Sequence, residues 1–186
     1  MTEPTDEIIA AAVQAGDVDA FGTLMERYEA KLKRYGRKFL AREEDITDLV
    51  QDVFIKSYEH IQSFQTDKRF SPWIYRIAHN VFVNELKRKS RYGSVFDADV
   101  LLPLMAAKET TDQAALDADL ERELDAHLTK LSAKYREVLV LHYYEDLSYQ
   151  EISDILHIPI TTVGVRMTRA RAKLKTLLPA ANQPTV

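Results

Sequence analysis

Apolar side chains recur every three or four residues over most of the chain, which is the spacing of one face of an α-helix. The pattern predicts one helix over about residues 19–35 and a second from about Asp45 to Ile61. Ser71 and Pro72 supply a capping residue and a first-turn proline for a third helix, which extends to about residue 89. No convincing series of alternating apolar and polar residues, the pattern of a β-strand, is present. The expected fold class is therefore all-α.

The helical periodicity fails after residue 90, where glycine, proline and clustered acids interrupt it. We interpret residues 91–119 as a flexible acidic linker between two small helical domains. The first domain is expected at residues 1–90 and the second at residues 120–179, followed by a frayed tail at residues 180–186.

The second domain contains the sequence pattern of a helix-turn-helix. Ser148 and Glu151 have the spacing of a capping box, in which each side chain satisfies a backbone N–H of the other residue. The short helix that they open is broken at His157, and a longer basic helix follows, with no acid between Pro159 and Leu178. An ordinary helical hairpin with a basic exterior is the alternative, but these features together favour DNA binding.

Charge is unevenly distributed along the chain, although the formal net charge is only -4. Residues 66–92 carry seven basic and two acidic side chains, and residues 129–186 carry eight basic and five acidic ones. Two basic segments separated by an acidic stretch indicate two contacts with a polyanion. Solvated helix faces are the alternative, and charge alone does not decide between them.

Composition excludes several classes of protein. The chain has no cysteine, which excludes disulfide scaffolds, thiolate zinc sites and cysteine nucleophiles. No apolar run approaches the roughly 18 residues of a membrane span, and the acidic N-terminus is unlike a secretory signal. We therefore expect a cytoplasmic protein without membrane insertion. The five histidines form no obvious ligand motif and no glycine-rich phosphate loop is present, so no metal, cofactor or catalytic residue is expected.

One face of the second predicted helix is acidic. Asp45, Asp48 and Asp52 recur at helical spacing, and Gln51 adds an amide beside them. Such a face could bind a divalent metal or could simply be solvated.

The third predicted helix carries Arg76, Asn80, Asn84 and Lys87 at spacings of four, four and three, on one face. Amide side chains can form two hydrogen bonds with a base edge, while cations hold phosphates. The preceding loop, residues 63–69, mixes an aromatic residue, polar groups and cations, and could accept a base taken out of its stack. Exposed polar residues without a ligand are the alternative, and nucleic-acid contact is favoured.

Several of these stretches resemble the extracytoplasmic-function (ECF) sigma factors of RNA polymerase, a group of the sigma-70 family. Residues 147–152 (LSYQEI) and 166–171 (RMTRAR) resemble region four of that family. Residues 48–54 (DLVQDVF) resemble region 2.2, and residues 70–80 (FSPWIYRIAHN) resemble the most diagnostic stretch of region two. The motifs stand in the family's order and cover nearly all of the chain except the linker and tails.

The resemblance implies an alternative sigma factor that binds core RNA polymerase, directs it to specific promoters and promotes strand opening. Its partners would be the clamp helices and flap of the polymerase, promoter DNA and an anti-sigma factor. The residues assigned by resemblance to polymerase binding are Asp45, Asp48, Gln51, Asp52 and Phe54. Those assigned to the minus-ten element are Phe64, Lys68, Arg69, Arg76, Asn80, Asn84, Lys87 and Arg88. Those assigned to the minus-thirty-five element are Thr161, Thr162, Val165, Arg166, Arg169, Arg171 and Lys173.

The sequence departs from the family's pattern at four positions. Gly164 and Val165 replace residues that are usually polar, and His157 occupies a turn position that usually favours glycine. Asn84 stands where many members carry aspartate. The alternative function is a dimeric helix-turn-helix regulator that acts without being a polymerase subunit, and an enzyme ranks third.

Overall fold

The computed structural model describes residues 3–40, 42–91, 127–128 and 130–177. Every regular element in these ranges is a helix, which confirms the all-α class. The chain divides into two compact units, the first taking in residues 1–94 and the second most of the later residues. Within the described ranges, no helix has both the length and the apolar character needed to cross a membrane.

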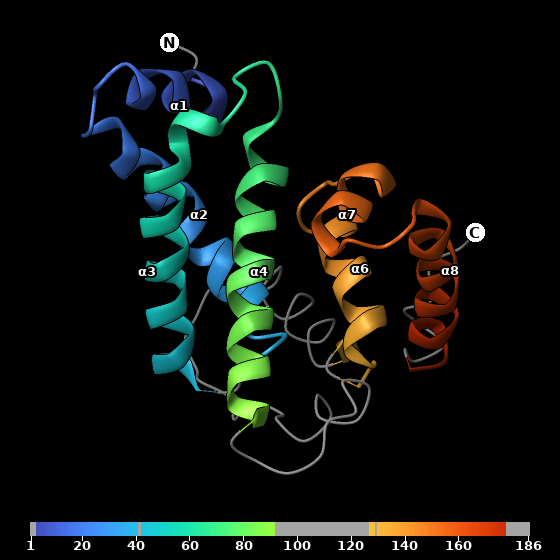
Figure 1. Ribbon diagram of the computed structural model, residues 1–186. Helices are drawn as coiled ribbons and strands as arrows, with labels where there is room; N and C mark the ends of the chain where they lie inside the picture. The colour runs from blue at the N-terminus through green and yellow to red at the C-terminus, as the bar shows by residue number, and fades with distance from the viewer. Residues whose placement is uncertain (1–2, 41, 92–126, 129, 178–186) are drawn as a thin grey trace, which may run out of the picture. The chain divides into compact units, whose positions relative to one another are not determined.

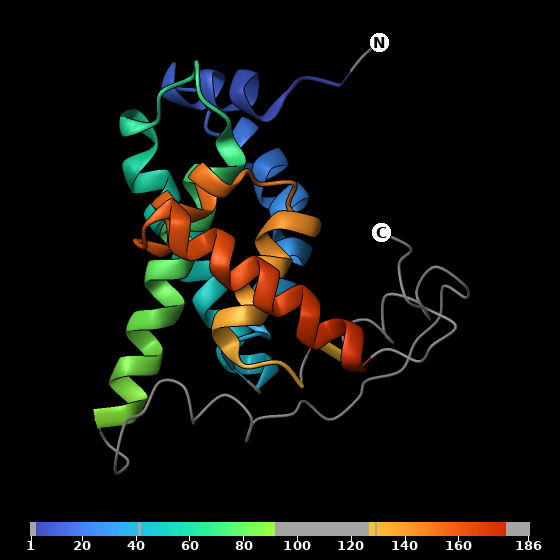
Figure 2. The ribbon, with the colours of Figure 1, turned by 90° about the vertical axis from the view of Figure 1, so that its right-hand side faces the viewer.

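In the described part of the first unit, the regular elements are four α-helices and one 3₁₀ turn (Figure 1). They are α1 (Asp6–Gln14), α2 (Ala20–Gly36), α3 (Glu43–His60), η1 (Ile61–Ser63) and α4 (Phe70–Arg91). In both ribbon views, α1 lies at the same end of the unit as η1 and the loop that leads into α4 (Figure 1 and Figure 2). The predicted helices correspond to α2, α3 and α4, whereas the sequence analysis did not predict α1.

An aromatic core joins α2 to α4. Tyr35 of α2 is fully buried, and its ring centroid lies 5.3 Å from that of Tyr75 and 6.0 Å from that of Phe82, both on α4. The last turn of α2 meets its neighbours so closely that any side chain at Gly36 would force a neighbouring atom to shift. A Cβ atom on Gly36 would lie 2.9 Å from Phe82 and 3.0 Å from Ile46 of α3. Gly36 thus brings α2, α3 and α4 together at one point.

The start of α4 differs from the prediction. Ser71 was expected to cap the helix, but α4 begins one residue earlier, at Phe70. The backbone N–H of Phe70 donates to Glu7 Oε1 of α1 at 3.0 Å. A side chain 63 positions earlier in the sequence therefore satisfies the first free N–H of this helix.

The second unit contains α6 (Ala133–Tyr143), most of α7 (Tyr149–Leu156) and α8 (Ile160–Leu177). The buried Val163, Met167 and Ala170 form an apolar stripe on α8, and α8 packs against α6. The predicted linker beyond Arg91 and the predicted tail at 180–186 lie outside the described residues.

Candidate nucleic-acid and partner-binding surfaces

The helix-turn-helix is built by local hydrogen bonds. The predicted capping box is present, since the N–H of Ser148 donates to Glu151 Oε2 at 2.7 Å and the N–H of Glu151 donates to Ser148 Oγ at 3.2 Å. In the turn, Ser153 Oγ donates to the Ile158 carbonyl at 2.6 Å. His157 has a φ of 53°, a left-handed conformation that favours glycine. The sequence pattern of a helix-turn-helix is confirmed, and the strained turn residue is His157.

The N-terminal part of α8 exposes its polar face. Thr161 and Arg169 are exposed, Val165 is 49 % exposed, and Thr162 and Arg166 are half-buried. Among the described residues, Arg166 and Arg169 form no hydrogen bond or ion pair. Their guanidinium groups are therefore available to a ligand on this face.

Arg171 and Lys173, the two candidates nearest the C-terminal end of α8, contact aromatic rings of a neighbouring helix. The guanidinium carbon of Arg171 lies 5.5 Å from the ring centroid of Tyr143, and Lys173 Nζ lies 5.1 Å from the ring centroid of Tyr135. Both tyrosines belong to α6. Cation–π contacts of this kind favour one position of a side chain, so Arg171 and Lys173 are directed toward α6.

Of the five polymerase-binding candidates on α3, three are exposed, one is half-buried and one is buried. Asp48, Gln51 and Asp52 are exposed and Asp45 is half-buried. Phe54, assigned to the same face by resemblance, is 4 % exposed and packs edge-on against Phe21 at 6.4 Å, so it belongs to the core. In the described part of the chain, no group of three or more histidine, aspartate or glutamate side chains could hold a metal ion.

Candidates from both helices meet in one open hollow between α3 and α4. Asp52 and Lys56 line it from α3, and Asn80, Asn84 and Arg88 line it from α4. The Arg88 guanidinium is held by Glu85, with Nε–Oε2 and Nη2–Oε1 distances of 2.6 and 2.7 Å. Two further cations of α4, at positions 76 and 87, are exposed. The acidic stripe and the amide-bearing stripe thus adjoin each other.

The loop before α4 presents a different set of groups than expected. Phe64 is 5 % exposed, and its ring centroid lies 5.3 Å from that of Phe70 and 5.4 Å from that of Trp73. Its expected contact with an unstacked base does not fit this buried position. Residues 65–69 are all exposed, and Lys68 Nζ lies 4.0 Å from Asp67. The loop surface is therefore polar and partly cationic, with its aromatic residue acting as an internal anchor.

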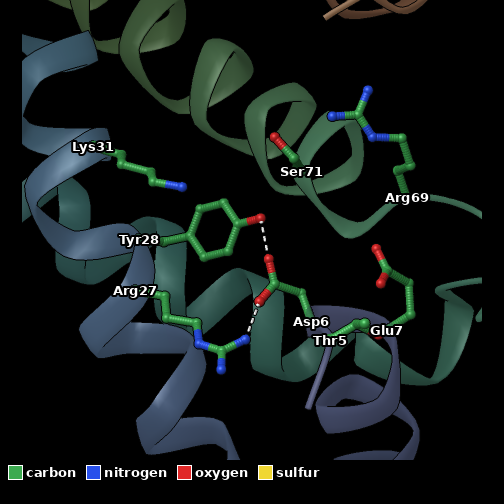
Figure 3. A pocket seen from close by; sticks show the side chains of 8 residues that line it. All are labelled: Thr5, Asp6, Glu7, Arg27, Tyr28, Lys31, Arg69 and Ser71. Atoms are coloured by element: carbon green, nitrogen blue, oxygen red, sulfur yellow. Dashed lines mark hydrogen bonds and ion pairs between the residues drawn. The ribbon is translucent and has the colours of Figure 1, made fainter. Parts of the chain in front are cut away.

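A polar cluster missed by the sequence analysis fixes α1 against α2 (Figure 3). Asp6 accepts hydrogen bonds from Tyr28 Oη at 2.6 Å and from Arg27 Nη1 at 2.7 Å. Burial, and then the hydrogen bond to Asp6, raise the pKa of the Tyr28 hydroxyl well above its usual value. The hydroxyl therefore stays protonated and keeps donating to the carboxylate. Thr5 caps α1 by accepting from the N–H of Ile8 at 3.4 Å.

Comparison with known families gives two matches along the chain. The sigma-70 region 2 family matches residues 24–92, and the sigma-70 region 4 family matches residues 121–174. The chain is 33 % identical over 171 residues to the ECF RNA polymerase sigma factor SigW of Bacillus subtilis, covering 88 % of this chain and 91 % of SigW. It is 32 % identical over 174 residues to the ECF RNA polymerase sigma-E factor of Escherichia coli K12, with coverages of 90 % and 91 %.

Solved structures agree with these relatives. CnrH, determined in complex with the cytosolic domain of CnrY, is similar with a TM-score of 0.65 at 30 % identity, covering 92 % of this chain and 96 % of CnrH. The sigma factor RpoE of Bartonella quintana, crystallised with the anti-sigma factor NepR, has a TM-score of 0.66 at 22 % identity, covering 84 % and 95 %. The second likeness shows the fold alone.

Proposed function

The chain belongs to the ECF group of the sigma-70 family, and we propose that it acts in the cytoplasm as an alternative sigma factor without catalytic chemistry of its own. It binds core RNA polymerase, directs the enzyme to specific promoters and promotes strand opening. The observation that carries this proposal is the order of the two family regions along one chain, each with an exposed candidate surface on its own helical unit.

We assign the tasks to two domains, as the sequence analysis expected. Residues 1–90 form the region 2 domain, which contacts polymerase and the minus-ten element. Residues 120–179 form the region 4 domain, which contacts the minus-thirty-five element, and residues 91–119 link the two.

Polymerase docking is assigned to the exposed acids and amide of α3. Asp48, Gln51 and Asp52 offer acceptors to a basic helix such as one of the polymerase clamp. Complementary charge across an interface raises the association rate and selects the partner. Phe54 supports this surface from below, because its ring is buried in the core.

Strand opening follows from a difference in affinity between two states of the promoter. Asn80 and Arg76 on α4, together with the polar loop 65–69, bind unpaired bases, which are accessible only after the strands separate, and the phosphates next to them. A ligand that binds the open state more tightly shifts the equilibrium toward it. No chemical step is needed, because the binding of unpaired bases by the protein supplies the free energy that favours the open state.

Upstream recognition is assigned to the exposed N-terminal part of α8. Arg166 and Arg169 are available for hydrogen bonds with base edges or phosphates in the major groove. Val165, 49 % exposed, can contact a thymine methyl group. Arg171 and Lys173 supply positive charge from positions against α6.

An anti-sigma factor is the second protein partner that we propose. CnrH, which is 30 % identical to this chain, was solved in complex with the cytosolic domain of a second protein, CnrY. The surfaces assigned here to polymerase and DNA are the ones that such an inhibitor would have to cover.

The test is binding to purified core polymerase. The double change Asp48→Ala, Asp52→Ala should weaken binding about tenfold or more, because it removes two charges from a complementary interface. The control Glu26→Ala, Glu29→Ala removes the same charge from exposed positions of α2 and should bind as the wild type does. Unchanged affinity of the α3 variant would exclude this docking face. A chain that binds duplex DNA as a dimer and ignores polymerase would be the helix-turn-helix regulator instead.

A further inference from the structure

Both ends of the exposed loop 65–69 are held by one helix that is distant in sequence. At the start, Gln14 Nε2 of α1 donates to the carbonyls of Ile61 and Phe64, at 2.7 and 2.8 Å. At the end, Glu7 Oε1 of the same helix accepts from the N–H of Phe70 at 3.0 Å.

Two of these bonds involve backbone groups at helix ends, which have no partner within their own helix. The Phe64 carbonyl directly follows η1, and the Phe70 N–H is the first of α4. The Ile61 carbonyl, at the C-cap of α3, also accepts from the Phe64 N–H at 3.0 Å. Glu7 and Gln14 are seven residues apart, so they lie on one face of α1, about 10.5 Å apart along its axis. A rigid helix thus fixes the separation of the two loop ends.

The helix that holds the loop is itself fixed. Ile9, Ala10 and Val13 of α1 are buried, and Asp6 is bound by Arg27 and Tyr28 of α2, as Figure 3 shows. The position of the loop is therefore set by α1, and the position of α1 is in turn set by its contacts with α2.

We propose that Glu7 and Gln14 are positioning residues for base capture, which set the conformation of loop 65–69 before DNA arrives. This inference rests on the proposed function, because it assumes that the loop binds an unpaired base. Within the loop, the Lys68 N–H donates to the Gln65 carbonyl at 2.9 Å. A loop held in its binding conformation loses less entropy on binding, so its affinity is higher.

The test compares holoenzyme binding to two forms of one promoter, identified by mapping the transcripts that the holoenzyme makes. One form is closed duplex and the other carries a pre-opened bubble over the minus-ten region. Gln14→Ala should reduce affinity for the bubble about 5- to 30-fold, as expected from two lost hydrogen bonds, and leave the closed duplex within twofold. Glu7→Ala should act in the same direction, and Glu7→Gln, which keeps an acceptor oxygen, should recover most of the loss.

Each outcome is decisive. Equal affinities of Gln14→Ala and wild type for the bubble would overturn the proposal, as would an equal loss on both DNA forms, which marks a general folding defect. If Gln14→Ala does not fold, the comparison of Glu7→Ala with Glu7→Gln decides in its place. A wild-type holoenzyme that does not prefer the bubble would instead contradict the proposed function.

Discussion

Gly36→Ala should destabilise the region 2 domain, although alanine is the better helix former. The added Cβ would lie 2.9 Å from Phe82 Cζ and 3.0 Å from Ile46 Cγ2. Overpacking of this kind costs about 1–3 kcal/mol, while replacing glycine by alanine in a helix returns up to about 1 kcal/mol. The two ranges leave a net loss in the free energy of unfolding of about 0–3 kcal/mol, centred near 1–2 kcal/mol. Each kcal/mol lost lowers the melting temperature by about 4–8 °C.

The assay can observe this domain alone. Trp73 is the chain's one tryptophan, and it packs against Phe64 and Phe70 in the first unit. Urea unfolding followed by tryptophan fluorescence therefore reports on the region 2 domain, and its midpoint gives the change in stability.

Gly22 is the matched control on the same helix. An added Cβ there has no atom within 4 Å, so Gly22→Ala should be neutral or stabilising by up to about 1 kcal/mol. The reasoning fails if Gly36→Ala is as stable as Gly22→Ala, because the close approach of α2 to α3 and α4 would then carry no cost.

Three further outcomes are expected. His157→Gly should stabilise the region 4 domain by about 1 kcal/mol, because glycine relieves the φ of 53°; an unchanged circular-dichroism melting curve would argue against strain at this turn. Arg166→Ala should weaken binding of the full chain's holoenzyme to duplex containing the upstream element by about 1–3 kcal/mol, and Arg171→Ala should weaken it less, as titrations on cognate and scrambled DNA would show. Partial burial raises the pKa of Glu7, but its hydrogen bonds, led by that from the Phe70 N–H, lower the pKa by more, so the net pKa lies below the usual 4.5. The stability that this shift provides is present above about pH 4.5 and is lost as the pH falls. In urea unfolding, the stability advantage of wild type over Glu7→Gln should therefore shrink below about pH 4.5.

The sequence predicted the elements whose signals are local. The apolar spacing located α2 and α3, and the capping box at Ser148 and Glu151 located the helix-turn-helix, because each signal spans only a few residues. The start of α4 could not be predicted in this way, since its cap comes from Glu7 of another helix. Short helix α1 was missed although Thr5, followed by two acids, is an N-cap signal.

Candidate site residues were harder to place than helices. Phe54 and Phe64 were assigned to binding surfaces, but both are buried; for Phe54, its place within the apolar stripe with Val50 and Val53 was the available signal. The positive charge of α8 does not show which way each side chain points. The contacts of Arg171 and Lys173 with tyrosines of α6 could therefore not be predicted from the sequence.

The most direct test of the account is permanganate footprinting of thymines near the start site, with core polymerase and a promoter mapped for the reconstituted holoenzyme. We predict that wild-type chain makes these thymines reactive on native duplex. Asn80→Ala should reduce this reactivity strongly while leaving closed-complex binding intact, because its contact with unpaired bases exists only after the strands separate. A pre-opened template should restore part of the signal. No polymerase-dependent reactivity with the wild-type chain would contradict the central claim, and wild-type reactivity with Asn80→Ala would remove Asn80 from strand opening.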